Sequence, residues 1–149
     1  MKIEDEIKQQ KFKDEFQKLF INLIFTSNWL YDQHSRFFKK FGITPQQYNV
    51  MRILNGQYPK PASVGMVLER MLDKSSNITR LVDKLASKNL VSRCENKENR
   101  RMQDLTITET GIEFLKNCQP EKEISSGLLK NISKEEAMII NNLLDKIRS

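Results

Sequence analysis

The stretch that decides the fold covers residues 73–108 and reads DKSSNITRLVDKLASKNLVSRCENKENRRMQDLTIT. Its first half places apolar side chains on one stripe, at steps of three and four residues: Ile78, Leu81, Val82, Leu85 and Ala86. This spacing is typical of an amphipathic helix, and it predicts one from Lys74 to about Lys88 with Asp73 as its cap. Asn89 follows, and Asn is the residue after Gly that best tolerates the left-handed conformation ending a helix.

The second half of the stretch predicts a β-hairpin. Residues Leu90–Cys94 and Asp104–Thr108 read as short strands, and the second alternates apolar and polar residues clearly. Between them, residues 96–101 are all polar or charged and end in the adjacent pair Arg100 and Arg101. A hairpin tip buries few side chains, so two arginines there indicate a partner outside the protein.

The rest of the chain is predicted to be mostly helical. Apolar periodicity without Gly or Pro predicts one long helix from Ile3 to about Lys40, bent near residues 26–28 and ended by Gly42. Start signals and periodicity predict four further helices, in chain order after Thr44, after Ser63, over Glu109–Asn117 and after Ser133. The segment Pro59–Pro61 is expected to be a connector, and Pro120 is expected to interrupt its region.

This order of elements predicts a winged helix-turn-helix, in which two short helices precede a hairpin and the second helix enters the DNA major groove. The fold class is therefore mainly α with a small β-hairpin wing. We expect residues 41–108 to form the DNA-binding region. Residues 1–40 and 109–149 would form a helical dimerisation region of the same integrated domain, because their apolar surface exceeds what a small winged core can cover. The alternative is that the first and last helices pack on each other within one chain.

The charge distribution favours DNA as the partner. The net charge is +6, and the window from Glu69 to Arg101 alone contributes +4 of it. Hydroxyl, amide and guanidinium groups read base edges and bind phosphates, and an arginine on a hairpin tip can enter a narrow minor groove. The candidate DNA contacts are Ser75, Ser76, Asn77, Thr79, Arg80, Lys84, Asn99, Arg100 and Arg101. The helix alone would fit an ordinary amphipathic surface helix equally well, and the charge of the hairpin favours the DNA interpretation.

The motifs Ser75–Leu85, Asn89–Arg93, Asn99–Arg101 and Ile107–Gly111 resemble those of the MarR family of bacterial transcription regulators, in the same order and spacing. The resemblance covers nearly the whole chain. It implies a symmetric homodimer held together by its N- and C-terminal helices. It also implies binding to a pseudopalindromic operator, usually as a repressor, and in many members release by a small aromatic ligand or by thiol oxidation.

Three positions depart from the family pattern. The wing of the family usually reads Asp-x-Arg, whereas Asn99 stands at the Asp position and keeps an acceptor oxygen without the charge. Ile107 replaces the usual Leu before Thr108, and Asn89 replaces the usual Gly after the recognition helix. Only the first departure bears on function, because the Asp of the family steadies the arginine that corresponds to Arg101.

Other classes of site find little support in the sequence. His34 is the only histidine, and Cys94 and Cys118 lack paired spacing, so neither a metal site, a cofactor site nor a disulfide framework is predicted. The cysteines are interpreted as structural thiols, with a thiol-based redox-sensing regulator as the alternative. No Gly-rich phosphate loop or nucleophile elbow is present, so an enzyme is not predicted.

The remaining alternatives concern partners and ligands. A winged helix that binds another protein would need an apolar exposed face on the second helix, and Ser76, Arg80 and Lys84 make that face polar. A ligand site is left unassigned, because the aromatic and apolar candidates Trp29, Phe37, Tyr48 and Met51, with Arg52 to pair a carboxylate, are more typical of a core. No apolar run approaches the ~20 residues of a membrane span, and no signal peptide is evident. A cytoplasmic protein is therefore expected.

Overall fold

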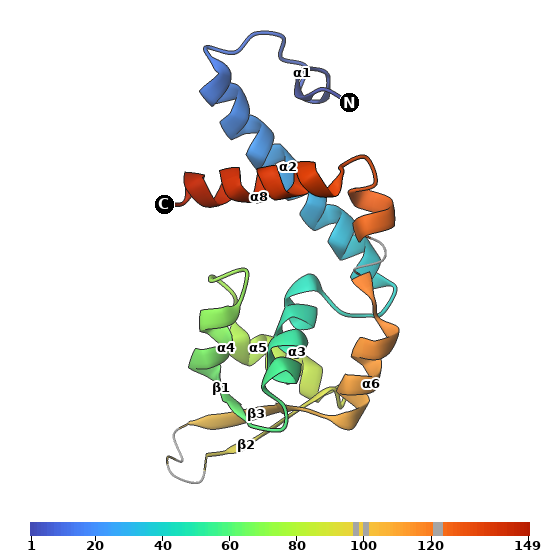
Figure 1. Ribbon diagram of the computed structural model, residues 1–149. Helices are drawn as coiled ribbons and strands as arrows, with labels where there is room; N and C mark the ends of the chain where they lie inside the picture. Colours follow the sequence, from blue (N-terminus) through green and yellow to red (C-terminus); the bar gives the residue numbers. More distant parts are fainter. Residues whose placement is uncertain (97–98, 100–101, 121–123) are drawn as a thin grey trace.

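The structure is a computed structural model that describes residues 1–96, 99, 102–120 and 124–149 (Figure 1). Its elements in chain order are α1 (Ile3–Glu6), α2 (Glu15–Lys39), α3 (Pro45–Gln57), β1 (Ala62–Ser63), α4 (Val64–Arg70), α5 (Ile78–Ala86), β2 (Val91–Glu95), β3 (Gln103–Ile107), α6 (Glu109–Asn117), a single π-helical turn η1 (Ile124–Leu128) and α8 (Lys134–Ile147). Figure 1 shows a lower part with the sheet and α3 to α6, and an upper part with α8 and much of α2. The predicted fold class, mainly α with a hairpin wing, is confirmed.

The hydrophobic core is built around α3, which contacts α2, α4, α5, α6 and β3. Val50, Met51 and Leu54 form its buried face, and each is at most 2% exposed. Val82 of α5 and Leu105 of β3 pack into the same cluster. Full burial of an aliphatic side chain contributes about 1.5–3 kcal/mol, so this cluster holds the helix-turn-helix against the sheet.

Two capping boxes begin α3 and α8 where the sequence predicts them. At α3 the Thr44 hydroxyl accepts a hydrogen bond from Gln47 N (3.2 Å), and Gln47 Oε1 accepts one from Thr44 N (2.9 Å). At α8 Ser133 and Glu136 exchange the same pair of bonds at 3.1 and 2.8 Å. Each box satisfies two backbone donors that a helix start otherwise leaves open, which explains why these starts were predictable.

The predicted hairpin is confirmed. Strands β2 and β3 pair antiparallel with Val91 opposite Ile107 and Cys94 opposite Asp104. Strand β1 was not predicted from the sequence; in it Ala62 pairs with Leu105 to complete a three-stranded sheet of order β1-β3-β2. A strand of two residues is too short to show alternation of apolar and polar residues, so the sequence pattern could not predict it.

The prediction of one long helix beginning at Ile3 is wrong. The chain turns after α1, Lys8 adopts a positive φ of 54°, and α2 begins only after Asp14. The Asp14 carboxylate accepts a hydrogen bond from Gln17 N at 2.8 Å, and the Gln17 side chain accepts one from Lys13 N at 2.7 Å. These two bonds cap the start of a new helix. The Asp-x-x-Gln spacing indicates this start in the sequence, but the prediction gave more weight to the apolar periodicity.

The start of the recognition helix also differs from the prediction. Asp73 does not cap it; the cap is Asn77, whose side chain accepts from Arg80 N at 3.0 Å, and α5 covers Ile78–Ala86. The Asp73 carboxylate instead holds a turn, because Oδ1 accepts from both the backbone N and the Oγ of Ser75, at 3.0 and 2.6 Å. A side chain that closes its own local turn competes with helix formation.

The upper part of the molecule exposes much apolar surface. Phe16 and Phe20 of α2 are 82% and 64% exposed, and no residue of α8 is buried. Ile139 and Leu143 of α8 are 58% and 55% exposed. Within the described residues, no helix combines the length and apolarity needed to cross a membrane.

Candidate nucleic-acid interface

The two faces of α5 differ sharply in chemistry. Ile78, Val82 and Leu85 point into the core and are at most 3% exposed. The residues exposed along the helix are polar or charged: Thr79, Arg80, Asp83 and Lys84, with Ser87 just after its end. Helix-turn-helix proteins present such a face to the major groove, where guanidinium, hydroxyl and ammonium groups meet base edges and phosphates.

The turn before α5 places the remaining candidates ahead of the helix rather than on it. Ser75 is exposed, and its hydroxyl hydrogen-bonds to Asp73, which lowers the pKa of that carboxyl below its ordinary value. Ser76 Oγ is buried and has no hydrogen-bond partner among the residues that the structure describes. Asn77 uses its Oδ1 as the helix cap, so its Nδ2 is the group left to meet a base.

An ion pair links the recognition helix to the wing. Arg93 Nη1 on β2 lies 2.5 Å from Asp83 Oδ1 on α5. Both side chains are 42–50% exposed, so the pair contributes little stability, within about 0–1 kcal/mol. Its effect is on orientation, because it ties the exposed face of α5 to the first strand of the hairpin.

The base of the wing tip is held by a small hydrogen-bond network. Asn96 Nδ2 donates to Asp104 Oδ1 at 2.9 Å, and Asn96 Oδ1 accepts from Asn99 N at 2.9 Å. Asn99 O accepts from Met102 N at 2.8 Å, which closes the turn. Arg100 and Arg101 lie outside the described residues, so their contact with Asn99 stays a prediction.

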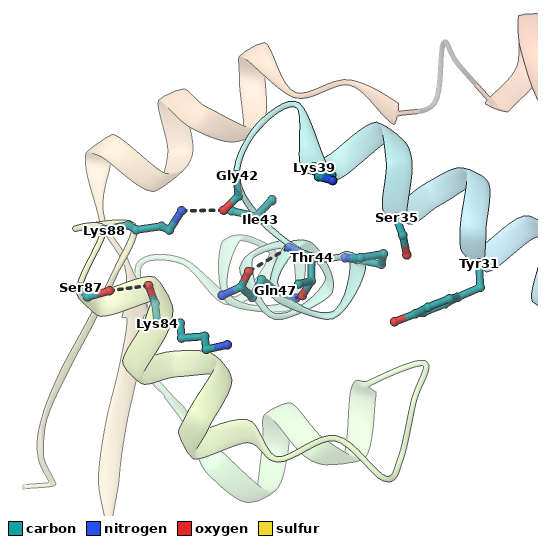
Figure 2. Close-up of a pocket in the computed structure, with 11 residues that line it drawn as sticks. Tyr31, Ser35, Lys39, Gly42, Ile43, Thr44, Gln47, Lys84, Ser87 and Lys88 are labelled. Carbon is teal, nitrogen blue, oxygen red and sulfur yellow. Dashed lines mark hydrogen bonds between the residues drawn. The ribbon is translucent and has the colours of Figure 1, made fainter.

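A cleft of about 460 Å³ runs beside the exposed face of α5, between its C-terminal end, the end of α2 and the start of α3 (Figure 2). We call it the lysine cleft, because Lys39, Lys84 and Lys88 line it. Lys88 Nζ is positioned by a 2.6 Å hydrogen bond to Gly42 O. Of these three lysines only Lys84 was predicted from the sequence; Lys88, four residues after Lys84, could have been found from helical spacing.

The other residues considered as candidates lie apart from this face. Met51 is fully buried, and Phe37 and Tyr48 pack against the core, so the interpretation of these three as core is confirmed. Trp29 lines a separate hollow with Ile3 and Phe25 in the upper part of the molecule. Cys94 is exposed on β2 and Cys118 is buried after α6.

Comparison with known proteins agrees with this geometry. The model of the MarR family matches residues 43–102, which span the helix-turn-helix and the first strand of the wing, β2. The chain is 32% identical over 110 residues to the transcriptional repressor MdtR of Bacillus subtilis, covering 73% of this chain and 70% of that protein. It is 29% identical over 131 residues to the transcriptional regulator MhqR of the same organism, covering 87% and 89%.

The solved structures agree on the fold. A MarR transcription factor from Planctomyces limnophilus superposes with a TM-score of 0.71 and 26% identity, covering 91% of this chain and 98% of that one. This coverage extends well beyond residues 43–102. The chain therefore belongs to the MarR family and is a DNA-binding transcription regulator.

Proposed function

We propose that the protein is a homodimeric repressor that binds a pseudopalindromic operator through α5 and the wing. The observation that carries the proposal is the polar and basic exposed face of α5, backed by a fully buried apolar face and joined to β2 by Asp83 and Arg93. One chain carries one such DNA-binding surface. In a dimer, two of these surfaces related by a two-fold axis would contact two half-sites about one helical turn apart.

The dimer is supported by the apolar side chains that α2 and α8 leave exposed. A contiguous apolar surface of this kind on a folded chain marks an interaction site. The alternative, that the two helices bury these side chains against each other, leaves Phe16 at 82% and Ile139 at 58% exposed. We therefore assign residues 1–40 and 109–149 to dimerisation and residues 41–108 to DNA binding.

We assign the DNA contacts by position. Thr79, Arg80 and Lys84 are exposed on α5, and Ser75 and Asn77 are exposed at its start. Ser76 can contribute only if its buried hydroxyl turns outward when DNA approaches. Asn99, Arg100 and Arg101 are assigned to the wing, with Arg101 reaching the minor groove.

The first test is to sequence the DNA that the protein retains from its own genome. The expected result is an inverted repeat whose half-sites lie about one helical turn apart. Affinity for that DNA should fall steeply with salt, because each phosphate contact by Lys or Arg releases a counterion. Retention of DNA without any shared sequence would contradict a sequence-specific regulator.

A variant of Arg80 separates base reading from backbone contact on the same DNA. If Arg80 reads a base, Arg80→Ala should reduce discrimination between the operator and random duplex by ~1–3 kcal/mol. Lys11→Ala is a matched control, because Lys11 is exposed in the segment before α2. Equal weakening of Arg80→Ala on both duplexes would assign Arg80 to phosphate.

The wing is tested by its two adjacent arginines. Arg101→Ala should weaken operator binding clearly more than Arg100→Ala and leave thermal stability nearly unchanged, since a tip residue buries little. Asn99→Asp tests the bracing of Arg101, because a charged acceptor strengthens a hydrogen bond to guanidinium roughly twofold. Operator titration of the three variants at two salt concentrations measures both effects. If Arg101→Ala binds the operator with native affinity, the wing is not part of the surface that contacts DNA.

Release by a small aromatic ligand is proposed from family membership, without an assigned site. Thiol-based sensing is the second candidate and rests on Cys94, whose thiol is exposed on the wing strand β2. Cys118 is 1% exposed and therefore poorly placed to react. Loss of operator binding on mild oxidation of the native protein, with retention in Cys94→Ser, would favour the second candidate.

A further inference from the structure

The lysine cleft gathers positive charge without a counterion. Among the described residues, those that line it include Lys39, Lys84 and Lys88, and none of them is an Asp or Glu. Within the described residues, Lys39 and Lys84 form no ion pair or side-chain hydrogen bond, and the only bond of the Lys88 ammonium is to a neutral carbonyl, Gly42 O. Three ammonium groups around one opening repel each other, and a bound anion would relieve that repulsion.

The neutral groups of the cleft are also donors. Tyr31 Oη accepts a hydrogen bond from Gln46 Nε2 at 2.8 Å, which leaves its own O–H free to donate. Ser35 lies beside Tyr31 on α2 and lines the cleft with it, as Figure 2 shows. Hydroxyl and ammonium donors without carboxylates form a site for an oxyanion rather than for a cation.

A buried amide supplies an independent observation. Gln47 is 3% exposed and lines the cleft. Its Oε1 is used by the capping box at Thr44 N, and its Nε2 donates to no partner among the described residues. Because the rest of the Gln47 side chain is enclosed in protein, the Nε2 donor can meet only what occupies the cleft, and an oxyanion there would accept its hydrogen bond.

The cleft continues the face that we assign to DNA. A second hollow, lined by Arg80 and Asn77, shares Thr44 and Lys84 with it. Arg80 and Lys84 lie four residues apart on one flank of α5, and Lys88, two residues beyond its end, lines the lysine cleft with Lys84. Together they form a basic row. The row leads from the predicted base contacts toward the end of α2.

We propose that the lysine cleft is a phosphate site, occupied by a backbone phosphate of bound DNA or by free inorganic phosphate. Lys39 and Lys88 bind the phosphate oxygens, and Gln47 donates to them through its amide. In the DNA complex the site extends the interface beyond α5 and the wing to the last turn of α2. The assignment of the DNA source rests on the proposed function, whereas the binding of free phosphate does not.

The DNA arm of the test uses Lys39→Gln, Lys88→Gln and the double variant on a fluorescent duplex of the retained sequence. If a backbone phosphate fills the cleft, the slope of log affinity against log salt should become shallower by roughly one for each lysine–phosphate pair that the variant removes. Lys11→Gln is the control, because it removes one exposed lysine before the start of α2, at the opposite end of that helix from Lys39. The control should keep the native slope.

The phosphate arm needs no DNA. Melting temperatures are compared in sodium phosphate and in sodium chloride at equal ionic strength. Phosphate also stabilises proteins by exclusion from their surface, but that effect is common to all variants. Specific binding should therefore appear as a larger phosphate shift in the native protein and in Lys11→Gln than in the double variant.

The two arms give distinguishable outcomes. A shallower slope in the cleft variants assigns the site to backbone phosphate, and loss of the phosphate shift alone assigns it to free phosphate. Native slope together with a native phosphate shift in the double variant overturns the proposal. Failure of the native protein to bind any duplex would defeat the proposed function, and the phosphate arm would still decide this inference. Lys88→Arg keeps the charge beside Gly42, so it separates loss of the cation from loss of local structure.

Discussion

Gly111→Ala is expected to lower the free energy of unfolding by about 3 kcal/mol or more, near the upper end of overpacking effects. A Cβ built at Gly111 would lie 2.1 Å from Leu90 O and 2.7 Å from Ile107 Cγ1. The first contact is with backbone, which cannot rotate away as a flexible side chain can. Helix α6 would have to move off the segment that ends the recognition helix.

That segment is held by two hydrogen bonds from Thr108, which itself caps α6, and this is why the displacement is costly. Leu90 O accepts a hydrogen bond from Thr108 N at 3.2 Å, and Asn89 O accepts one from Thr108 Oγ1 at 2.7 Å. Thr108 Oγ1 also accepts from Gly111 N at 3.0 Å as the cap of α6. The Thr-x-x-Gly motif after the wing therefore joins the ends of α5 and β3 to the start of α6.

Chemical and thermal unfolding measure the effect. For a chain of this size, 3 kcal/mol corresponds to a fall in melting temperature of roughly 6–12 °C. Gly56→Ala is the matched control, because Gly56 lies in α3 and a Cβ there meets no atom within 4 Å. That control should be stabilised by up to about 1 kcal/mol, since Ala is the better helix former. Native stability in Gly111→Ala would mean that α6 does not dock on Leu90 as described.

The parts of the fold that the sequence predicted are those in which local and tertiary signals agree. Thr44 with Gln47 and Ser133 with Glu136 cap the helices that periodicity also indicates. Asn89 has a φ of 55°, as the left-handed end of the recognition helix requires. In each case the deciding contact is made within a few residues, so it is visible in the sequence.

The failures occurred where one local signal outweighed another. Periodicity continues through residues 7–14, although the Asp14 cap begins a new helix there. Asp73 precedes an apolar stripe, as a helix cap does, but its carboxylate hydrogen-bonds to Ser75. The helix therefore begins only after its cap Asn77. Two caps were available four residues apart, and nothing in their spacing says which one the chain uses.

The candidate site was predictable in composition and only partly in geometry. Arg80 and Lys84 could be placed on the exposed face from helical spacing. Lys39 could not be associated with them, because it comes from the end of α2 and reaches the lysine cleft only through packing of α2 and α5 around α3. Contacts between residues far apart in sequence leave no periodic trace, so the cleft appears only in the structure.

Leu143→Arg is expected to convert the dimer to a monomer at micromolar concentration and to weaken operator binding at least about 100-fold. The reason is that linking two DNA-binding surfaces raises the affinity about 10²–10⁴-fold over that of one. Leu143 is 55% exposed in the single chain, so the substitution should cost the monomer fold little. A charge at that position would have to be buried without a partner if α8 forms the interface, which strongly disfavours association. Arginine makes the test stringent, because an added positive charge by itself would strengthen DNA binding. Weaker binding would therefore have to come from loss of the dimer.

Asn141→Arg is the control for Leu143→Arg. It adds the same charge two residues earlier on α8, about 200° away around the helix, on the side that carries the exposed Lys134, Asp145 and Arg148. Sedimentation velocity and operator titration should show a dimer with native affinity for Asn141→Arg, and a monomer with reduced affinity for Leu143→Arg. If Leu143→Arg remains a dimer that binds its operator normally, α8 lies outside the interface. The apolar stripe of Ile139, Leu143 and Ile147 would then have to be covered by something other than a second copy of this chain.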